Sequence, residues 1–481
     1  MKIDFKTPRV VVLGGGACGM TAAWELALAG ATVTVVEREE RLGGLCATHE
    51  LDGYRFDLGG HRFISKSGEL VERVRGLLGE ELLERQRRSA ILHRGRRFAY
   101  PLDALDLWRN LELAEVARAA LSYARARLEA RLRPGPEVSF EDWVVARFGR
   151  HLYDRFFGPY TAKLWGLPPS RLSADWAAER IAGLDLGGAA LRLLGLGGGR
   201  PRSYARGYFY PRLGIGQIFE SMGAEVRRLG GQILLGHALA DLVRDQKGRL
   251  AAVRVVDERG RPIELLCDYV VSTVSLPLVA RLAWPGEAAL HAHGAALRYR
   301  AVRFLNLLLD LPEVTPNTWL YVSEPDCLPT RIQEPRHRSP AMAPPGRSSL
   351  MLEIPCDRGG EIARLDDQAL LARARRDLER LGLGFVLPAV RGLFSTFVDE
   401  GYPIYDLGYA AHQRALLGAV ATVDNLLSVG RQGTFRYVFM DIAMEMGLVA
   451  ARQILRRSPS QRVFTDFRSD QSLLEAQATT A

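Results

Sequence analysis

A glycine-rich turn between two short apolar runs constrains the fold of this 481-residue chain more than any other feature. Residues 8–13 and 31–36 are rich in β-branched side chains and predict strands, while residues 20–29 have helical spacing. Between the first strand and the helix stand three glycines with the spacing GxGxxG: Gly14, Gly16 and Gly19. A strand, a glycine turn, a helix and a second strand form the βαβ unit of dinucleotide-binding proteins, so we expect the chain to fold around such a unit.

Each glycine of this turn has a separate physical role in such a unit. Gly14 permits the tight turn, Gly16 lets the backbone approach a pyrophosphate, and Gly19 lets the helix pack on the strand. The helix N-terminus then directs backbone N–H groups at the phosphates. Glu37 ends the second strand, where it is expected to accept hydrogen bonds from ribose hydroxyls and to disfavour a 2′-phosphate.

The net charge of +9 comes almost entirely from arginines spread along the chain, with only five lysines. No basic cluster is combined with stacking aromatics, so nucleic-acid binding is not expected. A small-molecule substrate that is phosphorylated or nucleotide-linked accounts better for the positive charge.

The five cysteines contain no CxxC pair, which indicates neither a disulfide framework nor a metal site. There is no room for a signal peptide and no transmembrane segment of about 18 apolar residues, so a cytoplasmic location is expected. Peripheral membrane contact and the oligomeric state stay open.

The remaining patterns suggest a discontinuous arrangement of domains. Residues 68–92 and 103–132 have helical patterns. Alternating runs at 231–256 and 261–274 predict strands, and so do the runs at 297–311 and 349–354. A last strand at 425–429 precedes a helix at 441–455. The expected parts are a dinucleotide-binding domain from residues 1–95, 207–285 and 410–457, a helical insertion at 96–182, a flexible glycine-rich loop at 183–206, a substrate-domain sheet at 286–409, and a poorly ordered tail at 458–481. The fold class is therefore α/β.

The segment after the βαβ unit separates FAD from NAD. It reads Arg41-Leu-Gly-Gly44 and then Asp57-Leu-Gly-Gly-His-Arg-Phe63. This pattern resembles the FAD superfamily that contains amine oxidases, protoporphyrinogen oxidases, phytoene desaturases and UDP-galactopyranose mutases. The resemblance implies a Rossmann-like, glutathione reductase-like FAD-binding domain with a mixed-sheet substrate domain. It also implies a set of cofactor-binding residues in this region: Arg38, Arg41, Gly43, Gly44, Gly59, Gly60 and His61.

His61 is the residue that the resemblance brings beside the isoalloxazine, and it is the first candidate for a catalytic residue. The alternative is a turn histidine that bonds only to the backbone. Near the C-terminus, residues 425–441 predict a strand, a glycine turn and a helix. In the superfamily such a helix N-terminus faces the electron-rich edge of the flavin, which implies four further cofactor-binding residues: Gly430, Arg431, Met440 and Asp441.

Two reaction classes fit this superfamily. In the first, FAD accepts a hydride from a C–N or C–C bond of a small organic substrate; in the second, reduced flavin interconverts the pyranose and furanose forms of a nucleotide sugar. Several motifs resemble those of the mutases and imply substrate-binding residues: Tyr160, Trp165, Arg300, Tyr402 and Tyr437. Arg300, Tyr402 and Tyr437 would also belong to the catalytic set, because a guanidinium and two phenols can hold a diphosphate.

Two considerations limit the mutase interpretation. The mutases carry a second arginine on a mobile loop, but residues 182–186 here read Ala-Gly-Leu-Asp-Leu, without one. A tryptophan such as Trp165 is more often a core residue than a site residue, and an arginine on an apolar strand such as Arg300 can equally extend its charged end to solvent or pair with a carboxylate. The oxidoreductase is therefore the preferred interpretation, and the mutase is the alternative.

Overall fold

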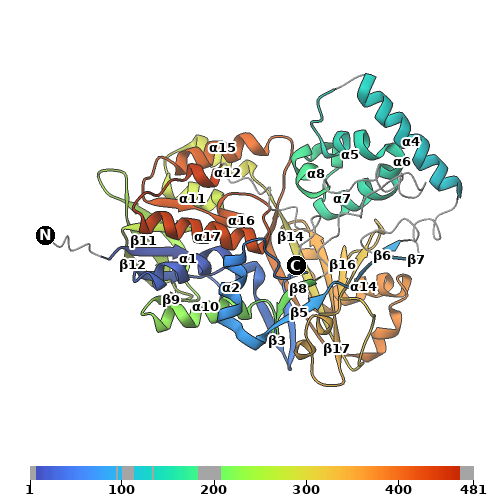
Figure 1. The fold of residues 1–481 in the computed structure, drawn as a ribbon, viewed down its shortest axis with the longest axis horizontal. Helices are drawn as coiled ribbons and strands as arrows, with labels where there is room; N and C mark the ends of the chain where they lie inside the picture. The colour runs from blue at the N-terminus through green and yellow to red at the C-terminus, as the bar shows by residue number, and fades with distance from the viewer. Residues whose placement is uncertain (1–6, 94–95, 100–112, 133–134, 182–206, 466–481) are drawn as a thin grey trace.

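A parallel sheet of five strands lies at the centre of one half of the molecule (Figure 1). The computed structural model describes residues 7–93, 96–99, 113–132, 135–181 and 207–465. In sheet order the strands are β19 (Leu426–Ser428), β13 (Tyr269–Ser272), β1 (Arg9–Leu13), β2 (Thr32–Val36) and β9 (Gln232–Leu234). With α1 (Ala17–Leu28) connecting β1 to β2, the expected βαβ unit is confirmed. Three distant parts of the sequence thus build one sheet.

Helices from both ends of the chain cover this sheet. α1 packs against α10 (Gln217–Arg228) and against α17 (Met440–Leu455) near the C-terminus. The contact with α17 is close because a Cβ atom on Gly447 would lie only 2.3 Å from the carbonyl oxygen of Cys18. α2 (Gly68–Leu78) packs on α10 at the outside. The two helices α1 and α17 therefore meet backbone to backbone, which fixes the glycine turn before α1 relative to the C-terminal segment before α17.

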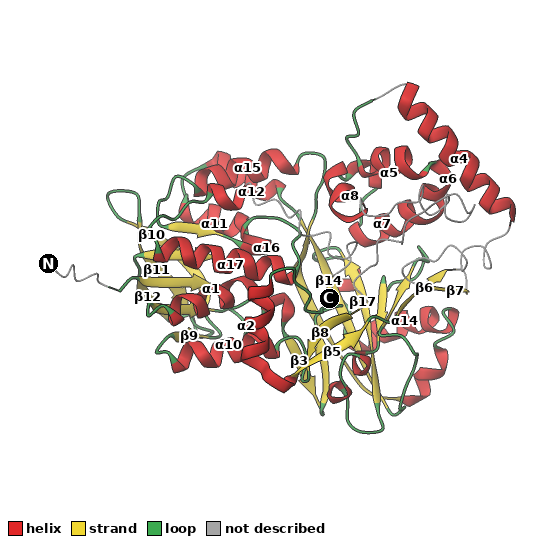
Figure 2. Cartoon of the chain, viewed as in Figure 1, coloured by secondary structure: helices red, strands yellow, loops and turns green. Residues whose placement is uncertain are grey.

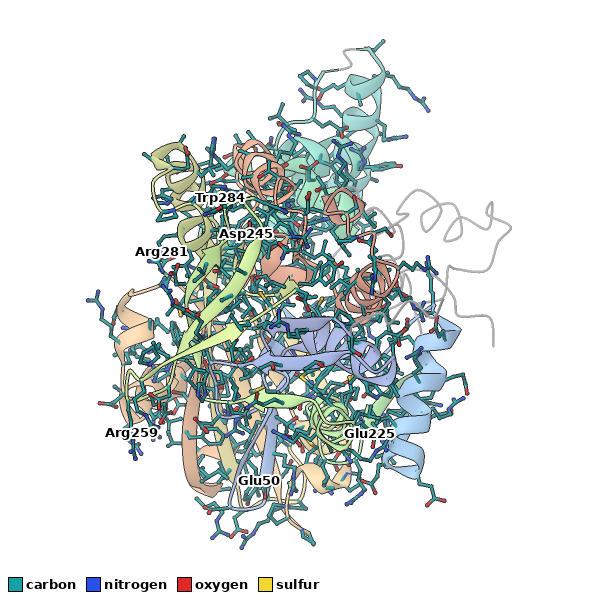
Figure 3. The ribbon with its side chains drawn as sticks, turned by 90° about the vertical axis from the view of Figure 1, so that its left-hand side faces the viewer. Glu50, Glu225, Asp245, Arg259, Arg281 and Trp284 are labelled. Carbon is teal, nitrogen blue, oxygen red and sulfur yellow. The ribbon has the colours of Figure 1, made fainter. Side chains whose placement is uncertain are left out.

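A small antiparallel sheet and a helical layer extend this half. The sheet consists of β10 (Ala238–Arg244), β11 (Leu250–Val256) and β12 (Pro262–Leu266). Figure 3 shows Asp245 and Arg259, which follow β10 and β11, at the exposed ends of this sheet. Beside it lie α11 (Leu276–Ala283), α12 (Ala288–Ala296) and α15 (Tyr409–Val420), which pack on one another.

The other half is built on a sheet of seven strands. In sheet order they are β18 (Val390–Pro403), β14 (Tyr299–Leu309), β17 (Ser348–Cys356), β16 (Arg331–Gln333), β15 (Trp319–Val322), β6 (Ser89–His93) and β7 (Arg96–Ala99). All neighbouring pairs are antiparallel except β15 with β6. One face packs on α14 (Asp367–Arg380), while the other turns toward the parallel sheet. β14 is buried along both faces, which fits its mainly apolar sequence, although Arg300, Arg303 and Asn306 interrupt it.

A group of helices stands beside the seven-stranded sheet (Figure 2). It contains α4 (Leu113–Leu132), α5 (Phe140–Phe148), α6 (Arg150–Leu152), a π-helical turn (Tyr153–Phe157), α7 (Gly158–Trp165) and α8 (Ala174–Ile181). Lys163 connects this group to the sheet, because its Nζ donates to the carbonyl oxygens of Val322, Glu324 and Pro329 at 3.2, 2.9 and 2.7 Å. Burial lowers the pKa of Lys163 to about 8. Its three donors all serve to hold α7 in place.

Two expectations from the sequence are corrected by the structure. The helix expected over residues 68–92 ends at Leu78, since Gly79 has a φ of +54° and strands β5 (Leu82–Gln86) and β6 follow. The tail is not disordered from residue 458, because α18 (Arg462–Thr465) packs with Phe464 fully buried. The loop at 183–206 and the positions 100–112 and 466–481 lie outside the described residues.

The overall architecture is a mixed α/β fold, as the sequence indicated. Short pairs of strands join its two halves: β3 (Thr48–Leu51) pairs with β4 (Tyr54–Asp57), and β5 pairs with β8 (Gly207–Pro211). Within the described ranges, no helix has both the length and the hydropathy needed to cross a membrane.

Candidate active site

A cavity of about 1520 Å³ lies between the two halves of the molecule. Its walls come from the turn between β1 and α1, the segments after β2 and β4, strands β14, β16 and β18, and the segment before α17. Pockets for drug-sized ligands usually measure about 300–1000 Å³. This cavity therefore has room for a large cofactor together with a second molecule.

The three glycines of the fingerprint are needed for different reasons. Gly14 has a φ of +101°, and a Cβ atom there would lie 2.2 Å from the Thr273 hydroxyl oxygen. A Cβ on Gly19 would lie 1.9 Å from the Gly14 carbonyl oxygen, so the fold itself requires glycine at both positions. Gly16 is different: its φ is −77°, and the nearest atoms to a Cβ are 3.8 Å away, across the cavity wall. The space beside Gly16 is left open by the protein.

Glu37 lies at the end of β2, where the sequence placed it, and lines the cavity. Its carboxylate accepts a hydrogen bond from the Gly15 amide at 2.6 Å and from the Glu39 amide at 2.9 Å. Burial raises the pKa of Glu37 above its usual value. Each oxygen uses one lone pair for these bonds, and the other remains available to a hydroxyl donor.

The paired glycines lie against the fingerprint turn. The Gly43 amide donates to the Gly15 carbonyl oxygen at 2.8 Å, and both paired glycines adopt positive φ, +109° at Gly43 and +54° at Gly44. A Cβ on Gly44 would lie 3.1 Å from the Cα of Gly16. The two glycine segments therefore form one backbone-lined wall of the cavity.

Arg38 and Arg41 flank this wall and line the cavity. Arg38 is exposed and pairs with Glu39 at 3.1 Å, whereas Arg41 donates to the Thr48 carbonyl oxygen at 3.1 Å. Both guanidiniums keep further donors, so they add positive charge beside the glycine wall.

Both ring nitrogens of His61 have protein neighbours. Nε2 lies 3.0 Å from the Leu58 carbonyl oxygen, which can only accept, so Nε2 carries the proton. Nδ1 then accepts from the Cys46 thiol, with 3.8 Å between sulfur and nitrogen. Burial lowers the pKa of His61 to about 4 and raises that of Cys46 to about 12, so both groups are neutral near pH 7. His61 lines the cavity as a fixed, uncharged ring.

The C-terminal segment brings an arginine into the cavity beside two tyrosines. The Cζ of Arg431 lies 3.9 Å from the ring centre of Tyr437 and 5.3 Å from that of Tyr402. The two phenol rings are stacked with centres 5.5 Å apart. Nε and Nη2 of Arg431 are buried and have no hydrogen-bond partner among the described residues. A buried guanidinium without such a partner calls for a polar ligand.

Gly430, Met440 and Asp441 complete this side of the cavity. Gly430 has a φ of +76°, and a Cβ there would lie 2.9 Å from the Cβ of Cys18, so the turn packs tightly on α1. Burial raises the pKa of Asp441, in the first turn of α17, to about 7, although the Ile442 amide donates a hydrogen bond to its carboxyl. This carboxyl lies at the edge of the cavity, and its protonation changes within the physiological range.

The substrate-binding residues suggested by the sequence do not all meet. Tyr402 and Tyr437 line the cavity together, but Arg300 is absent from its walls. The Arg300 guanidinium pairs with Asp357 and donates to the Leu164 carbonyl oxygen at 3.2 Å. This is the carboxylate pairing that the sequence left open as the alternative for Arg300.

The aromatic residues of α7 lie behind the cavity wall. Trp165 is buried and packs edge-on against Trp176 and Tyr402, with ring centres 4.6 and 6.0 Å apart. Burial raises the pKa of Tyr160, and the nearby charges that act on it are Arg331 and Glu353. Trp165 thus supports Tyr402 from behind, and Tyr160 faces a polar group that the sequence did not single out.

That polar group is the ion pair of Arg331 and Glu353. Arg331 donates from Nε and Nη2 to the two oxygens of Glu353, at 3.0 and 2.7 Å, and the Tyr402 hydroxyl donates to the same carboxylate at 2.8 Å. Burial, followed by the Glu353 charge, raises the pKa of Tyr402 well above its usual value. Arg331 stands in an otherwise irregular stretch of sequence, and only the register of β16 against β17 brings it to Glu353.

Three features of the cavity fit FAD. The open space at Gly16 admits a pyrophosphate next to backbone amides, and the unpaired atoms of Arg431 and Gln432 need polar partners. The volume accommodates the extended cofactor and leaves room beside it. Within the described residues, no cluster of three or more His, Cys, Asp or Glu side chains could hold a metal ion, and all five cysteines are free and buried.

Comparison with known proteins agrees with this geometry. The family model for flavin-containing amine oxidoreductases matches residues 17–455. A phytoene dehydrogenase of Streptomyces griseus is 26% identical over 399 residues, 72% of each chain. A coproporphyrinogen III oxidase of Propionibacterium freudenreichii subsp. freudenreichii is 26% identical over 200 residues, which are 40% of this chain and 38% of that protein.

Solved structures share the fold at lower sequence identity. A reduced UDP-galactopyranose mutase superposes with a TM-score of 0.79 at 21% identity, covering 99% of this chain and 98% of the other. A putrescine oxidase bound to putrescine superposes with a TM-score of 0.64 at 17% identity, covering 94% and 99%. Since the family model spans nearly the whole chain and the cavity fits the cofactor, the protein is an FAD-dependent oxidoreductase that belongs to the flavin-containing amine oxidoreductase family.

Proposed function

We propose that the enzyme oxidises a C–N or C–C single bond of a small organic molecule that binds between FAD and the seven-stranded sheet. A hydride leaves from a C–H bond at one carbon of that bond, a proton leaves from the neighbouring atom to solvent, and a C=N or C=C bond forms. One observation carries this proposal: a single cavity is lined on one side by the two glycine segments and on the other by strands β14, β16 and β18. When bound, FAD supplies the hydride acceptor. The chain's own residues bind and orient both molecules and exclude water.

The cofactor would extend along the glycine wall. Its diphosphate would lie at Gly16 and the N-terminus of α1, its adenosine ribose at Glu37, and its ring system near His61 and Arg431. Backbone amides at the start of α1 and the positive charge of Arg41 favour the diphosphate at that end. This placement uses the spare lone pairs of Glu37 and the unpaired donors of Arg431.

The finer division of the chain follows from this placement. We propose that the parallel sheet is a Rossmann-like, glutathione reductase-like FAD-binding domain formed by residues 1–88, 207–285 and 410–457. Strand β6 pairs with β15, and β7 pairs with β6, so residues 89–93 and 96–99 group with the substrate domain at 286–409 and not with the parallel sheet. The helices from residue 113 to 181 form the insertion.

Two side chains at the meeting point of the two halves, His61 and Tyr402, are neutral. His61 holds its proton on Nε2 toward Leu58 and has its other nitrogen occupied by Cys46, so it positions the adjacent Gly59–Gly60 loop and does not take up a proton at neutral pH. Tyr402 keeps its phenolic proton toward Glu353. Such a site favours hydride removal from a bond already activated by the substrate's own nitrogen or double bond.

A nucleotide-sugar mutase is the second candidate, and the stacked pair of Tyr402 and Tyr437 favours it. Both rings line the cavity beside Arg431, an arrangement able to hold a diphosphate. The engagement of Arg300 by Asp357 and Leu164 weighs against it, because that arginine was the expected phosphate ligand.

Anaerobic spectroscopy of the flavoprotein separates the two candidates. The oxidoreductase is expected to lose its oxidised-flavin absorption when an amine, porphyrinogen or polyene substrate is added without oxygen. The mutase would instead turn over UDP-galactofuranose only after reduction with dithionite, with no net electron transfer. Turnover of the furanose together with no bleaching by any of the three substrate classes would refute the oxidoreductase proposal. A purified protein that takes up no FAD would refute both.

A further inference from the structure

A row of five paired residues crosses the seven-stranded sheet beneath the cavity. Strand register places Phe304 opposite both Thr396 and Glu353, Arg331 opposite Glu353, and Tyr321 opposite Arg331. Directly paired residues share one face of a sheet. Thr396, Phe304 and Arg331 line the cavity, so the row forms the floor on the side away from the glycine wall.

Glu353 is fully engaged within this row. Its side chain is 1% exposed, and it accepts two bonds from Arg331, one from Tyr402 and one at 3.3 Å from the Gln333 amide. These contacts fix the plane of the Arg331 guanidinium, because a bidentate pair constrains both position and orientation. Glu353 therefore positions Arg331, and its carboxylate oxygens are already occupied by hydrogen bonds from protein groups.

The third nitrogen of Arg331 faces the cavity. Its side chain is 24% exposed, and among the described residues Nη1 has no hydrogen-bond partner. The Gly59–Gly60 loop passes next to it: a Cβ on Gly60 would lie 3.0 Å from Nη1. Glycine at position 60 thus keeps open the approach to a guanidinium whose other two donors are already bound.

The charges around this floor favour an anion. Arg331 and Arg431 both approach Tyr402, the first through Glu353 and the second over the phenol ring at 5.3 Å. Arg331 is paired with Glu353, whereas Nε and Nη2 of Arg431 have no hydrogen-bond partner among the described residues. Beside Arg331 the floor is apolar, with Phe304, Val302 and Val398 lining the cavity.

We propose that Arg331 is the substrate-recognition residue and that Nη1 binds a carboxylate or phosphate group of an anionic substrate whose apolar part rests on Phe304. This inference rests on the proposed function, because it names the class of molecule oxidised there. Arginine matches the geometry of both anions, and a charge-assisted hydrogen bond in a partly buried site selects them over neutral analogues. Arg331 takes the role that the sequence assigned to Arg300.

Calorimetric titration of the FAD-loaded enzyme tests the proposal with three probes of similar shape: benzoate, phenyl phosphate and neutral benzamide. The variant Arg331→Gln is expected to raise the Kd of the anions by roughly 10- to 100-fold, the range of one hydrogen bond to a charged group, and that of benzamide by less than about twofold. Because this change leaves Glu353 buried without its partner, the double variant Arg331→Gln/Glu353→Gln carries the same test without an unpaired charge. Tighter binding of benzoate assigns a carboxylate, and tighter binding of phenyl phosphate assigns a phosphate.

Arg347→Gln is the matched control, since this arginine pairs with Asp310 on the surface and its loss changes the net charge equally. It is expected to leave anion binding unchanged. Anion binding in the double variant equal to that of wild type would overturn the role of Arg331, and so would a wild-type enzyme that binds neither anion. Flavin content and anaerobic bleaching are measured on the same samples. If the flavin is bleached by substrate but the protein binds neither anion, the role of Arg331 is refuted and the proposed function stands.

Discussion

Replacing Gly16 with alanine tests separately whether glycine at this position is required for the stability of the fold and whether it is required for FAD binding. The φ of −77° is accessible to alanine, and a Cβ atom would find its nearest neighbours at 3.8 Å. Alanine reduces the conformational entropy of the unfolded chain, which stabilises the folded protein by about 0.4–1 kcal/mol. It is also a poorer N-cap than glycine, which destabilises the folded protein by a similar amount. The free energy of unfolding of the apoprotein should therefore change by less than about 1 kcal/mol.

The effect of Gly16→Ala on FAD should be far larger. The methyl group would occupy the open space and displace the diphosphate from the first amides of α1. Losing two hydrogen bonds to a charged group, each worth about 1.5–3 kcal/mol, weakens FAD binding by roughly 10²- to 10⁴-fold. Urea unfolding of the apoprotein measures the first quantity, and fluorescence titration with FAD measures the second.

Gly418→Ala supplies the control for this experiment, because Gly418 lies in α15 and a Cβ atom added there would have nothing within 4 Å. Alanine there should stabilise the helix by about 0.5–1 kcal/mol and leave FAD affinity unchanged. Undiminished FAD binding by Gly16→Ala would refute the placement of the diphosphate. A collapse in apoprotein stability would show instead that Gly16 is required by the fold.

Three further outcomes follow from the structure. Lys163→Met should lower the free energy of unfolding by about 2–4 kcal/mol, because three carbonyl oxygens lose their hydrogen-bond donor. Urea unfolding measures this change, and Lys247→Met, at an exposed lysine, is the control variant. Since the folded pKa of Asp441 is raised to about 7, the folded state binds the extra proton between about pH 4 and 7, and this group adds stability as the pH falls through that window. Asp441→Asn should remove up to about 1.4 kcal/mol per pH unit of that slope in the apoprotein, and an unchanged slope would contradict it. With the pKa of His61 lowered to about 4, the pH profile of kcat/KM should be unaltered between about pH 5 and 8 in His61→Gln, and loss of a wild-type inflection near about pH 6.5 would contradict a neutral His61.

The local parts of the site could be predicted from sequence. The strand, glycine turn and helix around Gly14–Gly19 are contiguous, and the contact that requires glycine at position 19, with the Gly14 carbonyl oxygen, lies within the same βαβ unit. The same holds for Glu37 at the end of β2 and for the helix that begins at Met440. Such elements are determined by short-range sterics and by hydrophobic periodicity, both of which are visible in the order of residues.

The ion pair of Arg331 and Glu353 depends on strand pairing and could not be predicted from the sequence. Arg331 lies in a three-residue strand within a proline-rich stretch, and Glu353 lies on a strand buried on both faces. Neither has a local pattern that indicates a site, because their contact arises only from the register of β16 on β17. Arg300 shows the reverse error: its local motif suggested a ligand, but Asp357, which the sequence did not link to it, takes up its guanidinium.

The packing of α1 on α17 has a consequence for synthesis of the protein in the cell. α1 ends at Leu28, yet its partner begins only at Met440 and the edge strand β19 only at Leu426. At a translation rate of about 5–20 residues per second, the apolar face of α1 waits roughly 20–90 s for the helix that covers it. The face of α1 that packs on α17 thus stays uncovered while the intervening residues are synthesised, and the flavin site is complete only after β19 and the start of α17 have been made.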